Sequence, residues 1–270
     1  MKEKKQYSWD AKEYAKHSSA QQVWARELIA KLQLRGNESL LDIGCGDGKI
    51  TAEIAEQLPE GEVLGIDSSP DMIALARKHF PQSNHPNLSF ELADASHLLF
   101  EKQFDLVFSN AALHWIKDHK PVLSGIQKSL KAEGRAFLQM GGKGNAEAII
   151  SLVDKIINEK EWRPFFTDFS FPYSFYEPEE YTQWLNEANL RPKRVELIPK
   201  DMSYGNKDGL AGWLRTTWFP YTDRVPVALR EKFVSRIINK YLETNPLDNE
   251  GCIHVDMIRL EVEANTGDER

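Results

Sequence analysis

Residues 40–49 read Leu40-Leu41-Asp42-Ile43-Gly44-Cys45-Gly46-Asp47-Gly48-Lys49 and carry the strongest local pattern in the chain. The apolar residues at the start predict a buried strand, the glycines predict a tight turn, and a helix is expected to follow. Gly44 and Gly46 let the backbone come close to a ligand with which a Cβ would collide, and the helix beyond them offers free N–H groups. We therefore expect a ligand on this turn.

The spacing of the glycines indicates which kind of ligand the turn suits. A dinucleotide-binding turn would have its third glycine at position 49, where this chain has Lys49, and Gly48 comes one residue early. A pyrophosphate is therefore less favoured than a smaller ligand. Asp42 lies at the end of the strand, and its carboxylate can bind the positive amino group of an amino-acid-like ligand, which a nicotinamide cofactor lacks.

From residue 39 to residue 140, short apolar runs alternate with amphipathic stretches. This order is typical of a mostly parallel sheet with helices on both faces. Helices are expected at 49–58, before Pro59, and at 70–80, where Ser69 is the N-cap and Pro70 the first helical residue. The expected strands are 40–43, 63–66, 88–92, 104–108 and 135–140.

The segments outside this core have weaker patterns. Residues 9–34 predict two helices that join at the polar residues 17–22. Ten aromatic residues lie between 162 and 184, a second aromatic cluster lies between 213 and 221, and a helix is expected at 227–241. Residues 254–262 alternate polar with apolar side chains, which is typical of an edge strand with one exposed face.

Two further carboxylates follow predicted strands and point to a nucleoside. Asp67 ends the second strand, where a carboxylate can accept hydrogen bonds from both hydroxyls of a ribose. Asp94 follows the third strand and can accept a proton from an adenine amino group, and Met72 can cover a purine face. Ser68 and Ala95 come directly after the two carboxylates, and we assign them to the same site.

Composition excludes several classes of protein. The 270 residues are 41% hydrophobic and 28% charged, which is typical of a globular chain, and the formal net charge of -7 disfavours nucleic acid as a partner. Cys45 and Cys252 lie far apart, and the histidines have no metal-ligand spacing, so we expect no disulfide framework and no metal. Without an apolar run long enough to cross a bilayer, the expected protein is soluble and cytoplasmic.

The turn and a later segment resemble a known family. Residues 42–48 are similar to motif I of class I S-adenosylmethionine-dependent methyltransferases. The segment 108–116 resembles, more narrowly, the trans-aconitate methyltransferase group and the insect juvenile hormone acid methyltransferases, as do residues 139–142 and 218–226. That later segment reads Phe108-Ser109-Asn110-Ala111-Ala112-Leu113-His114-Trp115-Ile116.

This resemblance implies a Rossmann-like α/β fold with a seven-stranded, mostly parallel sheet. Its last strand, near 254–262, would run antiparallel between two neighbours and be covered on both faces, in place of the edge strand that its alternation predicts. The implied divisions of the chain are a helical N-terminal lid segment at 1–36, a cofactor-binding core at 37–160, an aromatic-rich helical substrate cap with one core strand at 161–250, and the final core strand and tail at 251–270.

The resemblance also implies the cofactor and the site. The cofactor would be S-adenosyl-L-methionine, with Asp67, Asp94 and Asn110 at its ribose, adenine and methionine parts. In the resembled acid methyltransferases a glutamine and a tryptophan hold the acceptor carboxylate, and the alignment implies Gln21 for the glutamine, or Gln22 if the register slips by one residue, and Trp115 for the tryptophan. The aromatic segments would line an apolar pocket over the strand ends and exclude water.

Methyl transfer from a sulfonium is an in-line displacement that depends mainly on positioning, with the acceptor electron pair about 3 Å from the methyl carbon. A carboxylic acid with a pKa of about 4 is already ionised at neutral pH and needs no general base. An amide and an indole N–H orient it without the full charge of an arginine. If the acceptor were a hydroxyl, His114 would serve as the base.

Alternatives to this hypothesis stay open. The enzyme can act on a hydroxyl, an amine or a carrier-bound acyl chain, in which case its rate follows the ionisation of the acceptor or of His114. A nicotinamide dehydrogenase is disfavoured by Lys49. A binding module that keeps the nucleoside site without turnover is the non-enzymatic alternative. The expected partner is a small-molecule acid, with no membrane insertion, and the sequence leaves the oligomeric state open.

Overall fold

The structure, a computed structural model, describes residues 19–267. Within these residues the chain forms two compact units. The larger unit contains residues 19–143, 173–198 and the chain from 259 onward, and the smaller unit contains residues 144–172 and 199–258.

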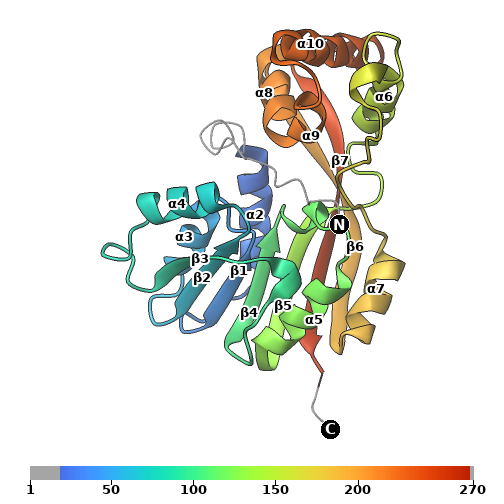
Figure 1. Ribbon diagram of the computed structural model, residues 1–270. Helices are drawn as coiled ribbons and strands as arrows, with labels where there is room; N and C mark the ends of the chain where they lie inside the picture. Colours follow the sequence, from blue (N-terminus) through green and yellow to red (C-terminus); the bar gives the residue numbers. More distant parts are fainter. Residues whose placement is uncertain (1–18, 268–270) are drawn as a thin grey trace. The chain divides into compact units, whose positions relative to one another are not determined.

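The larger unit is built on a seven-stranded sheet with the strand order β3-β2-β1-β4-β5-β7-β6 (Figure 1). The pairs β1–β2, β1–β4, β2–β3 and β4–β5 are parallel, whereas β7 runs antiparallel to β5. β6 and β7 continue into the smaller unit. The fold that the resemblance implied is confirmed. The strands are β1 (Ser39–Ile43), β2 (Glu62–Asp67), β3 (Leu88–Leu92), β4 (Phe104–Asn110), β5 (Leu130–Gly141), β6 (Leu190–Tyr204) and β7 (Ile253–Thr266).

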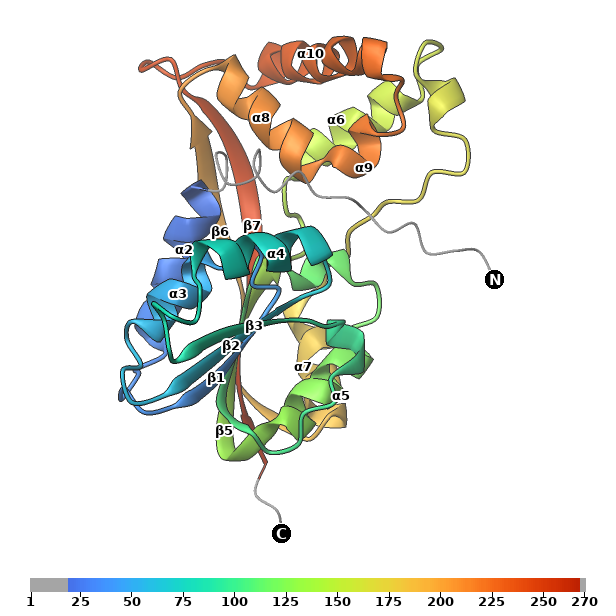
Figure 2. The ribbon, with the colours of Figure 1, turned by 60° about the vertical axis from the view of Figure 1, so that its left-hand side comes forward.

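Helices of the larger unit cover both faces of this sheet (Figure 2). One face packs against α2, α3 and α4, and the other packs against α5 and α7. These helices are α2 (Ser19–Lys31), α3 (Lys49–Ala55), α4 (Pro70–His79), α5 (Lys120–Ser129) and α7 (Pro178–Glu187), with the short 3-10 helices η1 (Ala95–His97) and η2 (Leu113–Trp115).

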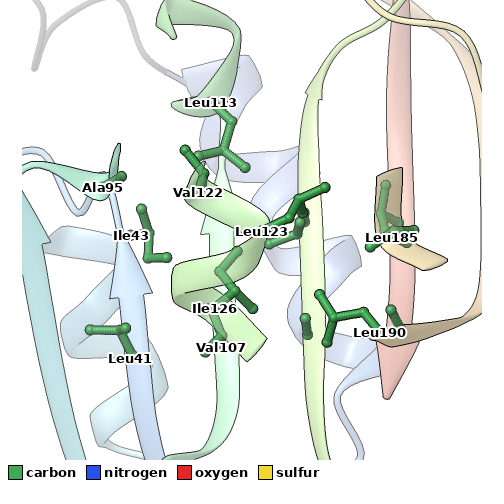
Figure 3. Packing of buried hydrophobic residues seen from close by; sticks show 14 of the residues in the cluster. Leu41, Ile43, Ala95, Val107, Leu113, Val122, Leu123, Ile126, Leu185 and Leu190 are labelled. Carbon is green, nitrogen blue, oxygen red and sulfur yellow. The ribbon is translucent and has the colours of Figure 1, made fainter. Parts of the chain in front are cut away.

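The central strands are mostly apolar in their middle, where both of their faces are buried. Leu40 belongs to the core beneath α2 and α3, whereas its neighbour Leu41 belongs to the core beneath α5, since successive side chains of a strand point to opposite faces. Figure 3 shows this second core, with Leu41 and Val107 of the strands facing Val122 and Ile126 of α5.

Local chemistry explains where the first helices begin and end. α4 begins as predicted, because Oγ of Ser69 accepts a hydrogen bond of 3.3 Å from the N–H of Met72 and Pro70 occupies the first turn. α3 ends at Ala55, three residues earlier than expected. The next N–H groups, of Gln57 and Leu58, bond to carbonyls three residues back, so the chain tightens into a 3-10 turn before Pro59.

β7 corrects the prediction of an edge strand at 254–262. The strand lies between β5 and β6, as the resemblance implied. Its alternation of buried and exposed residues holds only for 253–257, within the smaller unit. Farther along, Arg259 and Glu261 are polar and yet buried: Glu261 pairs with Lys31 and Arg194, and the guanidinium of Arg259 lies over the ring of Trp24. The alternation failed there because a buried charge that is paired by cations does not need an exposed face.

The N-terminal helical segment was predicted to have its joint at residues 17–22. α2 begins at Ser19, so residues 19–22 of this polar stretch are already helical. The helix includes the backbone of Gln21 in its first turn, whereas the side chain of Gln21 and the whole of the preceding segment lie outside the described residues. Lys31, at the other end of α2, pairs with the buried Glu261 of β7.

The smaller unit has a core of aromatic side chains. Trp162, Phe166, Tyr221 and Phe233 are buried, and the ring centroids of Trp162 and Phe233 lie 5.0 Å apart. The predicted helix at 227–241 is α10. No described helix is long and apolar enough to cross a membrane. The helices of this unit are α6 (Glu147–Ile157), η3 (Arg163–Phe165), α8 (Lys207–Thr217), α9 (Phe219–Thr222) and α10 (Val227–Thr244).

The aromatic segment 162–184 is divided between the two units. Its first half, up to residue 172, belongs to the smaller unit, and its second half belongs to the larger one. In the second half, Tyr181 and Trp184 lie on α7 and pack into the core beneath the sheet. These two rings are therefore part of the core of the larger unit.

Candidate active site

The glycine turn after β1 is held by the end of β2. The N–H groups of Gly44 and Cys45 both donate to the carbonyl of Ile66, at 2.7 and 3.0 Å. The next N–H, of Gly46, donates to Oδ2 of Asp67 at 3.1 Å. Two of the predicted site residues are thereby joined, and the shape of the turn depends on the carboxylate of Asp67.

The glycines of the turn are required for different reasons. Gly44, Gly46 and Gly48 have φ angles of 80°, 55° and 82°, a region that L side chains rarely adopt. A Cβ on Gly44 would lie 2.1 Å from the Cβ of Ala112, and one on Gly48 would lie 2.7 Å from Phe90. A Cβ on Gly46 would meet no described residue within 4 Å. Within the described residues, Gly46 is therefore the glycine of the turn that leaves room for a ligand.

Asp67 has the position and the spare capacity that a ribose contact requires. Its Oδ1 accepts from the N–H of Ser69 at 2.8 Å, and its Oδ2 accepts from Gly46. Each carboxylate oxygen can accept more than one hydrogen bond, so both keep capacity for a ligand hydroxyl. Burial raises the pKa of Asp67 above its ordinary value, although the backbone N–H groups act in the opposite direction.

Asp42 is a buried acid close to Asp67. Its Oδ2 accepts a hydrogen bond of 2.7 Å from Oγ1 of Thr51 in α3. Burial raises the pKa of Asp42 to about 7, and the charge of Asp67 adds to the shift. Burial and the carboxylates of Asp42, Asp67 and Asp47 also raise the pKa of Cys45 on the turn. Asp47 is paired with Lys49 at 2.9 Å and Asp42 is only partly ionised at neutral pH, so a cationic ligand that favours the ionised form of Asp42 suits the turn better than a pyrophosphate.

The other predicted cofactor residues lie at the same edge of the sheet, because parallel strands end together. Ser68 follows β2 and is exposed, Met72 is buried in α4, and Ala95 is buried in η1. Asp94 is the N-cap of η1, where its Oδ1 accepts from the N–H of Ser96 at 2.8 Å, and half of its side chain is exposed. Asn110 is the last residue of β4.

The predicted acceptor residues lie on η2, directly after β4. The ring of His114 lies 5.9 Å from the rings of both Trp115 and Tyr173, and Trp115 packs edge-on to Tyr173 at 4.8 Å. Nδ1 of His114 lies within 3.5 Å of the N–H of Gly141, where it can only accept. Burial, together with the charge of Arg259, lowers the pKa of His114 well below its ordinary value. At neutral pH His114 is therefore uncharged and a weak base.

Sequence reasoning missed a segment that binds this turn. Residues 173–176 lie alongside residues 113–117, and three of the turn's carbonyls accept hydrogen bonds from them. The N–H of Ser174 donates to His114 at 2.9 Å, Oγ of Ser174 donates to Ile116, and the hydroxyl of Tyr176 donates to Lys117. The abundance of aromatic residues pointed to this segment, but nothing in the sequence paired it with η2.

Arg259 of β7 is a second residue that sequence reasoning missed. It is 3% exposed, and its guanidinium carbon lies 5.4 Å from the ring centroid of Trp24 in α2. In the strand register it is the partner of Gly141, the residue that contacts His114. The prediction of an edge strand at 254–262 gave Arg259 no role, so its place beside the site came only from the structure.

Known proteins resemble the chain across this region. The model of a family described as "Methyltransferase domain" matches residues 34–189, more than half of the chain. An uncharacterized methyltransferase of Schizosaccharomyces pombe is 34% identical over 212 residues, which cover 77% of this chain and 79% of that protein. A trans-aconitate 2-methyltransferase of Methylobacterium nodulans is 28% identical over 263 residues, 93% of this chain and 96% of the relative.

Solved structures agree on the fold. The crystal structure of the YcgJ protein of Bacillus subtilis matches with a TM-score of 0.63 at 18% identity, covering 91% of this chain and 98% of that one.

Proposed function

Because the chain belongs to the methyltransferase-domain family and is an S-adenosylmethionine-dependent methyltransferase, we propose that it methylates a carboxylate oxygen of a small or medium organic acid. The observation that supports this proposal is the low basicity of the two histidines at the Leu113-His114-Trp115 turn. Both histidines at this turn are weak bases, since burial lowers the pKa of His119 to about 4 and that of His114 well below its ordinary value. An acceptor that is already ionised suits such a turn.

The residues around the glycine turn fit the cofactor. S-adenosylmethionine carries a positive sulfonium and a positive amino group, and the carboxylates of Asp42, Asp47 and Asp67 surround the turn. We assign the ribose hydroxyls to Asp67 and the amino group to Asp42. The open space beside Gly46 leaves room for the ligand at the position where the backbone must come close to it. When bound, the cofactor supplies a methyl group on an electron-poor sulfur.

The remaining cofactor contacts follow from the order of the strand ends. We assign the adenine to Asp94 and Ala95 of η1 with Met72 on its face, and the methionine part to Asn110 at the end of β4. Ser68 stands beside Asp67 at the ribose. These roles are supported by the position of the residues at one edge of the sheet, the edge at which open α/β sheets bind ligands.

We assign Trp115 to the acceptor carboxylate, with Gln21 as the second donor. An indole N–H orients the carboxylate and leaves its electron pairs available, so the chain supplies position rather than proton transfer. His114 accepts from Gly141 through Nδ1, which places its proton on Nε2. In this arrangement His114 shapes the turn and can donate to an oxygen, and it does not act as a base.

The trans-aconitate 2-methyltransferase relatives support a small acid as the acceptor class. The experiment that tests the proposal is a screen with tritium-labelled cofactor over mono-, di- and tricarboxylic acids, fatty acids and isoprenoid acids, with phenols and amines in parallel. The proposal expects tritium in a product that releases labelled methanol in alkali, as an ester does. Transfer only to phenols or amines, with a product stable in alkali, would overturn it.

A matched pair of variants tests the role of Trp115. Trp115→Phe should lower kcat/KM for the acid at least tenfold and leave the affinity for S-adenosylhomocysteine within twofold. Trp162→Phe is the control, because Trp162 is buried in the core of the smaller unit, with its ring centroid 5.0 Å from that of Phe233. Equal effects of the two variants on kcat/KM would contradict the assignment of Trp115.

A further inference from the structure

We propose that His119 and Tyr181 are positioning residues that hold the Leu113-His114-Trp115 turn in the geometry that presents Trp115 to the acceptor. Sequence reasoning assigned no catalytic or binding role to His119 or to the hydroxyl of Tyr181. The inference rests on the proposed function for the identity of the acceptor, but the holding of the turn can be measured without any acceptor.

His119 is fully buried and every polar atom of its ring has a partner. Nε2 lies 2.8 Å from the carbonyl of Leu113 and 3.1 Å from that of Ile116, at the two ends of η2. Nδ1 lies 3.1 Å from the hydroxyl of Tyr181. A carbonyl can only accept, so the ring proton is on Nε2, and Nδ1 accepts from the hydroxyl of Tyr181.

The protonation states support this assignment. Burial keeps the pKa of His119 near 4, so the ring is neutral at physiological pH and Nδ1 is available as an acceptor. Burial also raises the pKa of Tyr181 above its ordinary value, so its hydroxyl stays protonated and donates. One tautomer therefore satisfies all three contacts, and the alternative tautomer would leave the carbonyls of the turn without a donor.

This ring joins α7 to two elements that follow one another in sequence, η2 and α5. His119 is the N-cap of α5 and contacts the carbonyls at both ends of η2, and Tyr181 of α7 contacts the ring of His119. The two rings are perpendicular, with centroids 5.6 Å apart. The position of η2 relative to the helices beneath the sheet thus depends on His119.

Most of the turn is tied by its backbone. The carbonyls of Leu113 and Ile116 accept from His119, and those of His114 and Lys117 accept from the segment 173–176. Trp115 lies between these tied residues. Because a displacement of 1 Å at a reacting group can lower a rate by about two orders of magnitude, a turn held in this way acts on catalysis through geometry.

The test uses two replacements of the same side chain. His119→Gln can place an N–H donor near the position of Nε2 and so keep a bond to the turn. The asparagine side chain in His119→Asn is shorter and reaches only the position of Nδ1. It can still accept a hydrogen bond from the hydroxyl of Tyr181, but it cannot donate one to the carbonyls of the turn. A structural role in packing alone would not separate these two variants.

Two measurements apply to both variants. The first is the indole N–H resonance of Trp115 in a two-dimensional nitrogen–proton spectrum, identified by its loss in Trp115→Phe. The second is the split between kcat/KM for the acceptor and the dissociation constant of S-adenosylhomocysteine. In His119→Asn we expect the resonance to broaden or shift and kcat/KM to fall at least tenfold, with cofactor affinity within twofold. In His119→Gln we expect the resonance to return to its position in the parent and kcat/KM to lie within about threefold of the parent value.

The outcomes separate this proposal from the proposed function. If no acid is methylated but the Trp115 resonance still distinguishes Asn from Gln, the acceptor class is wrong and the positioning role stands. If Asn and Gln behave alike in both measurements, the positioning role is overturned. Should His119→Asn fail to fold, Tyr181→Phe replaces it, with the same resonance expected to move by a smaller amount; an unchanged resonance there would equally overturn the proposal.

Discussion

The N–H of Gly46 donates to Oδ2 of Asp67 at 3.1 Å, so the turn after β1 takes its shape from a carboxylate at the end of β2. This bond makes one structure of two motifs that are 21 residues apart. Asp67 is thereby given two tasks, the shape of the turn and the contact with a ribose. A variant at Asp67 would disturb both the shape of the turn and the contact with the ribose. Variants of the glycines can test these two effects separately.

Gly44→Ala and Gly46→Ala should differ in how they change the stability of the protein and its affinity for the cofactor. The new Cβ at Gly44 would lie 2.1 Å from Ala112, so this variant should lose more than about 2 kcal/mol of stability. The Cβ at Gly46 would meet none of residues 19–267 within 4 Å, so the loss there should be about 1 kcal/mol, from the positive φ. Gly46→Ala should nevertheless weaken S-adenosylhomocysteine at least tenfold. Calorimetric titration and thermal unfolding of both variants test this, and unaltered binding by Gly46→Ala would refute it.

Binding of the cofactor should release protons below neutral pH. The pKa of Asp42 is raised to about 7 in the ligand-free fold, above its value in the unfolded chain, so the ionised form is disfavoured and the contribution of Asp42 to stability falls as pH rises from about 4 to 7. A positive amino group beside Asp42 favours the ionised form. Calorimetry at pH 6 in buffers of different ionisation enthalpy should therefore show a release approaching one proton, which declines toward zero at pH 8.5. Proton uptake at pH 6 would contradict the assignment of Asp42.

Two buried tyrosines should respond in opposite ways to loss of their hydroxyl. Tyr181→Phe leaves Nδ1 of His119 without its donor and should cost about 1 kcal/mol of unfolding free energy. The hydroxyl of Tyr221 is buried and has no hydrogen-bond partner among the described residues. Tyr221→Phe should therefore be neutral or stabilising by up to about 1 kcal/mol. Denaturant unfolding of both variants tests this prediction. A larger loss of unfolding free energy in Tyr221→Phe than in Tyr181→Phe would show that the description of these hydroxyls is wrong.

Features that depend on neighbouring residues could be predicted from the sequence. The strand, turn and helix at 40–49 and the capping of α4 by Ser69 are local, because a glycine turn or an N-cap needs only the next few residues. The order of strands and the place of β7 came from resemblance to a family. Local pattern alone had put β7 at an edge.

Features that depend on distant pairs could not be predicted in this way. Glu261 is buried because Lys31 and Arg194, from two other elements, neutralise it. His119 contacts Tyr181, 62 residues away, and Ser174 contacts a turn 58 residues before it. Periodicity reports which face a residue occupies, but it says nothing about which partner from another element meets it there. The positioning contacts of η2 were therefore visible only in the structure.

A carboxylate acceptor is already ionised and needs no base. This is tested by kcat for the acid identified by the screen, measured with saturating cofactor from pH 7 to pH 9 in the parent chain, with alkaline hydrolysis of the product. We expect a rate that changes less than about twofold over this range and a product that loses its labelled methyl group in alkali. A rate that rises about tenfold per pH unit, with a product stable in alkali, would contradict it.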